Sequence, residues 1–191
     1  MAPSTARPTF AAIASLHLGR LYSIARPLVA DQAEDAVQDC LLKAYRAYGQ
    51  LNDPAAAGAW LTAILVNCCR DRARAQARHP ATVDIDEVED FSLFAKIAGE
   101  DPFPYSDSLH LDFLHQFGRD DVRAVLLALP SIYRAPLVLV HMHGFATKEV
   151  ARMLHAPLGT ILSRLHRGRK LFERRLWDHA ERNGLLTKER A

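Results

Sequence analysis

The sequence predicts an all-α protein, made of two small helical domains joined by an acidic linker, with a helix-turn-helix in the C-terminal domain. Apolar residues recur at spacings of three and four in both halves, and no strand-like alternation occurs anywhere. The charge is divided by position, with +3 on residues 1–80, −8 on residues 81–118 and +7 on residues 119–191. Basic ends around an acidic middle indicate two modules that bind a polyanion.

Length and composition exclude several other classes of protein. None of the apolar runs in the 191 residues approaches the roughly 20 that span a bilayer. The first residues lack the basic start and apolar core of a signal peptide, so we expect a cytoplasmic protein without a membrane segment. Cys40, Cys68 and Cys69 are too few for a disulfide framework or a four-cysteine zinc site. We therefore expect neither a metal nor a cofactor.

The first domain, residues 1–80, is predicted to hold three helices. The first starts at Phe10, and Pro27 should kink or end it, because proline lacks an amide hydrogen. Asp31 and Glu34 have the spacing of a capping box at the start of a second helix. A third helix follows over residues 59–78, with an apolar side near its start and arginines gathered toward its end.

Residues 81–118 are predicted to be a linker, because they follow Pro80, contain Pro102 and Pro104, and hold an acidic run without a sustained period. Helical spacing returns at Val122, stops at Pro130 and resumes from Ser131 to Gly144. Pro136 should distort the start of that second helix mildly. The C-terminal domain is therefore expected to begin near residue 119.

The last two predicted helices, residues 147–154 and 158–178, are separated by three residues, the short joint of a helix-turn-helix. In the second of them, Ile161, Leu165 and Gly168 share one face and should pack inward. Hydroxyl and basic side chains suit a helix in the major groove, where they bond base edges and phosphates. The residues on the outer face of this second helix are Thr160, Ser163, Arg164, Arg167, Lys170 and Arg174.

Three segments together resemble the extracytoplasmic-function (ECF) sigma factors of bacterial RNA polymerase, members of the sigma-70 family. LPSIYRAPLVLVHMHGFATKEVARMLHAPLGTILSRLHRGRKLFERRL, residues 129–176, is similar to the domain that binds the minus 35 promoter element. AEDAVQDCLLKAYRAY (33–48) and AWLTAILVNCCRDRAR (59–74) resemble the first domain of the same family, in the same order. The pairing of both domains is much more specific than a helix-turn-helix alone.

The resemblance implies a protein that binds core RNA polymerase, directs it to promoters and helps to open the DNA. It implies an anti-sigma protein as a further partner. Contacts with the minus 35 element are implied for Thr160, Ser163, Arg164, Arg167 and Lys170. Contacts with the minus 10 element are implied for Trp60, Asn67, Arg70, Asp71 and Arg74. Docking on the polymerase clamp is implied for Glu34, Asp35, Gln38 and Asp39.

Each of these assignments has a purely structural alternative. Trp60 could serve only as a core anchor, the acidic face of the second helix could be merely solvated, and the linker could be a spacer rather than a segment that threads the polymerase. The sequence also departs from the family pattern at several positions, including Leu162 where lysine is common and Val66 where arginine is frequent. Ala146 stands where a serine commonly caps the first helix, and His155 replaces the usual glycine, where we expect a positive φ.

Three other functional classes are alternatives to a sigma factor. An enzyme would need a convergent set of reactive groups; His141 and His143 lie two apart and face different sides, and no glycine-rich phosphate loop occurs. A helix-turn-helix repressor or activator that acts without polymerase is the main alternative to a sigma factor. Such a protein would need a ligand pocket or dimer face in its first domain and has no reason for the segments AEDAVQD and NCCRDRAR. A protein-binding adaptor fits the segregated basic ends less well.

Overall fold

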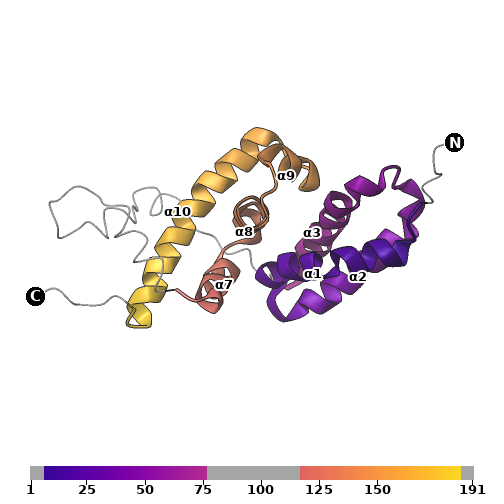
Figure 1. The fold of residues 1–191 in the computed structure, drawn as a ribbon. Coiled ribbons are helices and arrows are strands. Elements are labelled where there is room, and N and C mark those ends of the chain that lie inside the picture. The colour runs from indigo at the N-terminus through magenta and orange to yellow at the C-terminus, as the bar shows by residue number, and fades with distance from the viewer. Residues whose placement is uncertain (1–6, 77–116, 186–191) are drawn as a thin grey trace, which may run out of the picture.

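The computed structural model describes residues 7–76 and 117–185, and within these ranges all regular secondary structure is helical. The first group comprises α1 (Phe10–Val29), α2 (Ala33–Arg46) and α3 (Ala57–Gln76). The second comprises α7 (Arg119–Ala128), α8 (Ser131–Leu137), α9 (Thr147–Met153) and α10 (Leu158–Arg182). Figure 1 shows the two groups side by side, with α7 and α8 between α10 and the first group. The predicted fold class is confirmed.

The three helices of the first group share one apolar core. Leu21 and Ile24 of α1, Val37 of α2, and Leu61 and Leu65 of α3 are almost completely buried there. Each helix contributes one apolar stripe, because three- and four-residue spacing places side chains on one face. The third helix was predicted from residue 59 to 78; it starts two residues earlier, and its predicted end lies outside the described residues.

The expectation that Pro27 ends the first helix is wrong, since α1 continues through it to Val29. A proline in the last turn removes only one helical hydrogen bond, and the carbonyl that loses its donor is that of Ser23, four residues earlier. His143, from the second group, lies near the Ser23 backbone; burial lowers the pKa of His143 most, and this backbone raises it in part. The backbone group freed by Pro27 therefore lies where the two halves of the molecule meet.

The predicted capping box of Asp31 and Glu34 is also wrong. Ala30–Gln32 forms a 3-10 turn that contains Asp31, and α2 begins at Ala33 without a side-chain cap. Glu34 lies in the first turn of α2, where a negative charge still favours the helix dipole. The motif marked the correct place for a helix start but not its hydrogen bonds.

The distortion expected from Pro136 appears one turn later than predicted. The helix α8 passes without a break into a π-helical segment, η4 (Val138–Met142), whose Val138 and Leu139 are fully buried. A π turn shifts the helical register by one residue. This segment carries His143, at its C-terminal cap, to the Ser23 backbone of α1.

The helix-turn-helix is formed by α9 and α10. His155 in the turn has φ +50°, as the sequence predicted from the missing glycine. Ala146 caps α9 without a side-chain bond, but its own amide donates to the Glu149 carboxylate at 2.8 Å, which is half of a capping box. Gly168 lets α10 approach α8 closely, because a Cβ there would lie 3.2 Å from both Tyr133 Cβ and Leu137 Cδ1.

The two groups of helices pack against each other, which the sequence analysis did not anticipate. α1 contacts α7 and η4, while α3 contacts α8 and α9. Across this joint, the Arg20 guanidinium lies 4.7 Å from the centre of the Phe145 ring, and Arg70 Nη1 donates to the Leu154 carbonyl oxygen at 3.3 Å. Nearly all of the predicted linker lies outside the described residues, and the domain boundaries stay a prediction.

Candidate nucleic-acid interface

The helix α10 presents a polar and basic face opposite its buried stripe. Ile161, Leu165 and Gly168 are buried, as predicted from their spacing. Ser163 and Arg167 are exposed. The other predicted contacts on this helix, Thr160, Arg164 and Lys170, are partly buried. Leu162 is half exposed among them, so an apolar side chain also lies on this face.

The predicted minus 10 residues lie along one helix, α3. Trp60, Asn67, Asp71 and Arg74 are spaced by seven, four and three residues, which places them on one side of the helix. Trp60 is partly buried and packs against the core, in agreement with its structural alternative as an anchor. Asp71 and Arg74 are exposed and Asn67 is partly buried, so polar groups dominate the C-terminal part of this side.

Local hydrogen bonds orient the Asn67 side chain. Its Nδ2 donates to the Ala63 carbonyl oxygen at 3.0 Å, and its Oδ1 accepts from Arg70 Nη1 at 3.4 Å. The Asp71 carboxylate lies 3.9 Å from Lys43 Nζ of α2. The candidate base-contacting groups of α3 are therefore held in place by neighbours before any DNA binds.

The acidic face of α2 is divided between exposed residues and an ion pair. Glu34, Asp35 and Gln38 are exposed, whereas Asp39 is partly buried. Arg72 of α3 donates from Nη2 to Asp39 Oδ2 at 2.5 Å, and its Nη1 lies 3.6 Å from Asp35 Oδ2. Hydrogen bonding with Asp39 raises the pKa of Arg72, so this guanidinium stays charged. The pair ties the predicted polymerase-binding helix to the predicted promoter-binding helix.

Sequence reasoning missed Arg72 as a structural partner of the acidic face. It noted Arg72 only as one of several arginines near the end of the third helix. Asp39 and Arg72 are 33 residues apart, and no local spacing rule joins residues at that separation. The i, i+4 spacing of Asp35 and Asp39 is the signal that could have suggested a shared cation.

Arginines of the two predicted promoter-binding helices lie close together at the joint. Arg70 and Arg74 of α3 and Arg164 of α10 line one cleft of about 100 Å³. Burial lowers the pKa of Arg70 most, and the charges of Arg74 and Arg164 lower it further. The helices expected to bind two separate promoter elements therefore face each other here.

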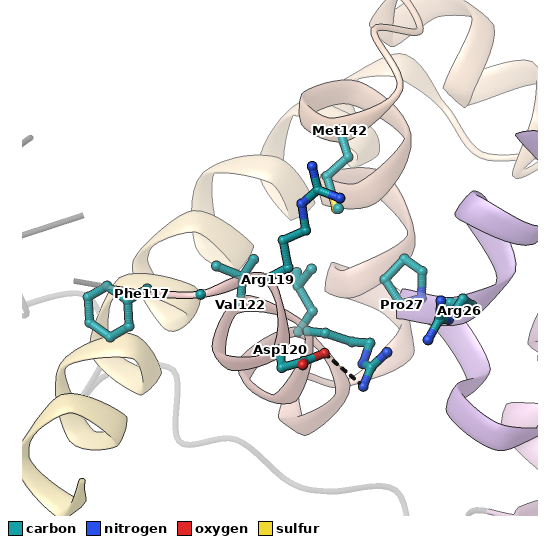
Figure 2. Close-up of a pocket in the computed structure, with 10 residues that line it drawn as sticks. Arg26, Pro27, Phe117, Arg119, Asp120, Val122 and Met142 are labelled. Carbon is teal, nitrogen blue, oxygen red and sulfur yellow. Dashed lines mark ion pairs between the residues drawn. The ribbon is translucent and has the colours of Figure 1, made fainter. Parts of the chain in front are cut away.

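A second and larger pocket opens at another part of the joint. Figure 2 shows this pocket of about 490 Å³, with Pro27 of α1 facing residues of α7 and with Met142 of η4 beyond them. Arg123 forms an ion pair with Asp120 at 3.0 Å. The pocket thus combines apolar side chains with three arginines. Its lining comprises Arg26, Pro27, Phe117, Gly118, Arg119, Asp120, Val122, Arg123, Leu126 and Met142.

The three cysteines are buried rather than at the surface, and Cys69 lines a small cavity at the joint with Leu28 of α1 and Arg134 of α8. Burial raises the pKa of Cys40 and of Cys69 to about 12, and burial raises the pKa of Cys68 as well. Cys40 Sγ donates to the Leu61 carbonyl oxygen at 3.4 Å. Among the described residues, no cluster of three His, Cys, Asp or Glu side chains is suited to hold a metal ion. No helix in that part of the chain meets the length and hydropathy of a membrane span.

Family models and individual relatives agree on what the chain resembles. Residues 13–79 match the model of sigma-70 region 2, and residues 119–172 match that of sigma-70 region 4. The ECF RNA polymerase sigma factor SigM of Mycobacterium tuberculosis is 32% identical over 162 residues, covering 84% of this chain and 73% of the relative. The ECF RNA polymerase sigma-E factor of Escherichia coli is 27% identical over 158 residues, covering 80% and 78%.

A solved structure extends the similarity to the fold. The sigma factor RpoE of Bartonella quintana, in complex with the anti-sigma factor NepR, matches with a TM-score of 0.61 and 25% identity. The match covers 88% of this chain and 96% of that chain. The chain belongs to the ECF sigma factors of the sigma-70 family. It is a transcription initiation factor, not an enzyme, that binds core RNA polymerase and directs it to promoter DNA.

Proposed function

We propose that this sigma factor divides promoter binding between α10, for the minus 35 element, and α3, for the minus 10 element. The observation that carries this division is the outer face of α10, where Ser163 and Arg167 are exposed opposite a buried apolar stripe. A helix with hydroxyls near its start and arginines beyond them suits the major groove of a duplex. Thr160, Arg164 and Lys170 complete that face.

The end of α3 suits a different DNA form. Asn67 offers both a donor and an acceptor, and Asp71 adds an acceptor one turn later. Such groups can hold the edge of an unstacked base, while Arg70 and Arg74 hold phosphates of a separated strand. Trp60 supports this helix from the core side. Strand opening at the minus 10 element is the role that fits this arrangement.

Core polymerase docks, in this proposal, on the exposed face of α2. Glu34, Asp35 and Gln38 have no part in the core, because the opposite stripe of α2 is already buried against α1 and α3. Asp39 contributes mainly by holding Arg72, and so by fixing α2 relative to α3. Charged groups at the rim of such an interface set specificity and association rate.

Promoter binding requires the joint between the two groups to open. The two promoter elements are centred roughly 25 base pairs apart, which is about 85 Å along B-DNA at 3.4 Å per base pair. Arg70 and Arg164 line one small cleft, so they cannot occupy both elements in the arrangement described. We therefore propose that core polymerase binds the open form, in the bacterial cytoplasm where polymerase and DNA lie.

An anti-sigma protein is the further partner that we propose. The similar RpoE chain is bound to such a protein, NepR. The pocket shown in Figure 2 offers apolar surface at the joint, together with Arg26 and Arg119, for which the described residues supply no carboxylate partner. Such a surface suits an acidic, amphipathic segment. A partner held there would keep the two groups of helices together.

Transcription with purified components tests the proposed function. We expect the chain and bacterial core polymerase together to initiate from a subset of a promoter library, while the chain alone binds the same duplexes weakly. The reason is that the joint leaves the two DNA-binding helices facing each other until polymerase separates them. Nanomolar binding of one promoter by the isolated chain in physiological salt would favour the repressor alternative instead.

A further inference from the structure

The cleft between α3 and α10 is lined by three arginines and, among the residues that the structure describes, by no acidic one. Its lining combines Arg70, Arg74 and Arg164 with Ser131. The charge of Asp71 also acts on Arg70, but Asp71 is exposed, does not line the cleft and lies 3.9 Å from Lys43. The remaining lining is apolar and comes from Ile132, Ala135, Pro136 and Leu154. Three like charges around one small space repel each other unless an anion lies between them.

The arginines keep hydrogen-bond donors for such an anion. Arg70 uses one nitrogen, Nη1, for the Leu154 and Asn67 oxygens, which leaves the rest of its five N–H groups. Within the described ranges, the structure pairs neither Arg74 nor Arg164 with a carboxylate. Their guanidinium groups reach the cleft from opposite sides of the joint, Arg74 from α3 and Arg164 from α10.

We propose that this cleft binds a small phosphate-bearing anion and thereby holds the two groups of helices together. Guanidinium groups bind phosphate oxygens in pairs, and a tetrahedral oxyanion can accept from three directions at once. A DNA duplex cannot be the occupant, because a space of about 100 Å³ is far smaller than a double helix. The site exists only in the closed form, since its arginines come from both groups.

Binding of this anion opposes the promoter binding proposed above, on which this consequence rests. Arg70, Arg74 and Arg164 cannot grip the anion and DNA at the same time. The ligand would stabilise the closed form by a free energy that grows with the logarithm of its concentration relative to its Kd. A sigma factor with this site responds to the supply of a phosphate metabolite without a second protein.

Calorimetric titration of the full chain with pyrophosphate, at constant ionic strength, tests the site without polymerase or DNA. We expect saturable binding near one equivalent and a higher Tm with the ligand. Arg164→Ala and Arg74→Ala should each weaken binding about tenfold, because each removes charge-assisted hydrogen bonds from one side of the joint. Arg169→Ala is the matched control: it removes one exposed charge from α10 outside the cleft and should change the Kd less than twofold.

Three results would overturn the proposal. The first is that pyrophosphate shows no saturable binding. The second is that Arg164→Ala and Arg169→Ala lose equal affinity for pyrophosphate. The third is that citrate binds as tightly as pyrophosphate. Circular dichroism of each variant shows whether it is folded. If Arg164→Ala proves unstable, Arg164→Lys replaces it; this variant keeps the charge and should retain part of the affinity for pyrophosphate. Polymerase-dependent transcription is measured separately, so failure of the anion site leaves the sigma factor assignment to be judged on its own assay.

Discussion

The Arg72 guanidinium of α3 donates a hydrogen bond to the Asp39 carboxylate of α2 at 2.5 Å, and the same guanidinium lies 3.6 Å from Asp35. The side chains of Arg72 and Asp39 are 25% and 47% exposed, so the pair is only partly screened by water. It joins the helix that we expect to bind polymerase to the helix that we expect to bind promoter DNA. Changes at Asp39 therefore affect the structure as well as any contact with polymerase.

We expect Asp39→Lys to lower both the stability of the protein and its affinity for core polymerase. The substitution places a second cation beside Arg72, which should cost about 1 kcal/mol of unfolding free energy. Glu34→Lys makes the same charge change at an exposed position of α2 and should weaken polymerase binding with little change in Tm. Thermal unfolding and a polymerase binding assay of both variants measure the difference. Equal Tm values for the two variants would contradict the structural role of Asp39.

Arg164 and Asn67 should affect different ends of the promoter. We expect Arg164→Ala to cost roughly 1 to 3 kcal/mol of binding and to relax preference only at the minus 35 element, if it makes a bidentate base contact. Asn67→Ala should impair strand opening or preference at the minus 10 element while upstream occupancy persists. Footprinting and permanganate reactivity of the holoenzyme complexes separate the two effects. A downstream defect from Arg164→Ala with normal upstream occupancy would contradict the assignment.

Gly168 should be intolerant of a side chain, because α10 packs against α8 at this position. A Cβ there would lie 3.2 Å from Tyr133 Cβ, which the backbone holds in place. We expect Gly168→Val to cost about 1 to 3 kcal/mol of unfolding free energy through overpacking. Gly159→Val in the same helix is the control, since a Cβ there would meet nothing within 4 Å. Chemical denaturation measures both, and a similar midpoint for the two variants would show that the helices separate easily.

The cysteines should be unreactive in the folded protein. At pH 8 a thiol with a pKa of about 12 has about a thousandfold less thiolate than one with the ordinary pKa of 9.0. We expect Cys40 and Cys69 to react with a thiol reagent only after unfolding. Because the folded thiols keep protons that unfolded thiols release above pH 9, they should also lower the free energy of unfolding as pH rises from 9 to 12.

Denaturant-dependent labelling followed by mass spectrometry measures the reactivity of each cysteine. Cys40→Ala and Cys69→Ala together should flatten the alkaline loss of stability, since alanine has no proton to release. Rapid labelling of Cys69 in the native protein at pH 8 would show that the joint between α3 and α8 opens locally.

Local patterns in the sequence predicted the elements well. The stripe of Ile161 and Leu165 predicted which side of α10 is buried, because helical spacing alone decides which residues share a face. The absent glycine at His155 predicted a positive φ, because the turn geometry requires it whatever residue is present. Capping was less predictable. Asp31 and Glu34 match the spacing of a capping box, but Asp31 lies inside a 3-10 turn that directly precedes α2.

The sequence by itself determined the all-α class, the helix-turn-helix and the faces of α2, α3 and α10 that remain outside the core. Only the tertiary structure decided which distant groups meet. Arg72 pairs with Asp39 across 33 residues, and Arg70 bonds the Leu154 carbonyl across 84. The reason is that helical periodicity depends only on neighbours within a few turns of the chain. The partner of a long charged side chain depends instead on how whole helices pack. Many arginines in this chain are equivalent in the sequence until that packing places one of them beside a given oxygen.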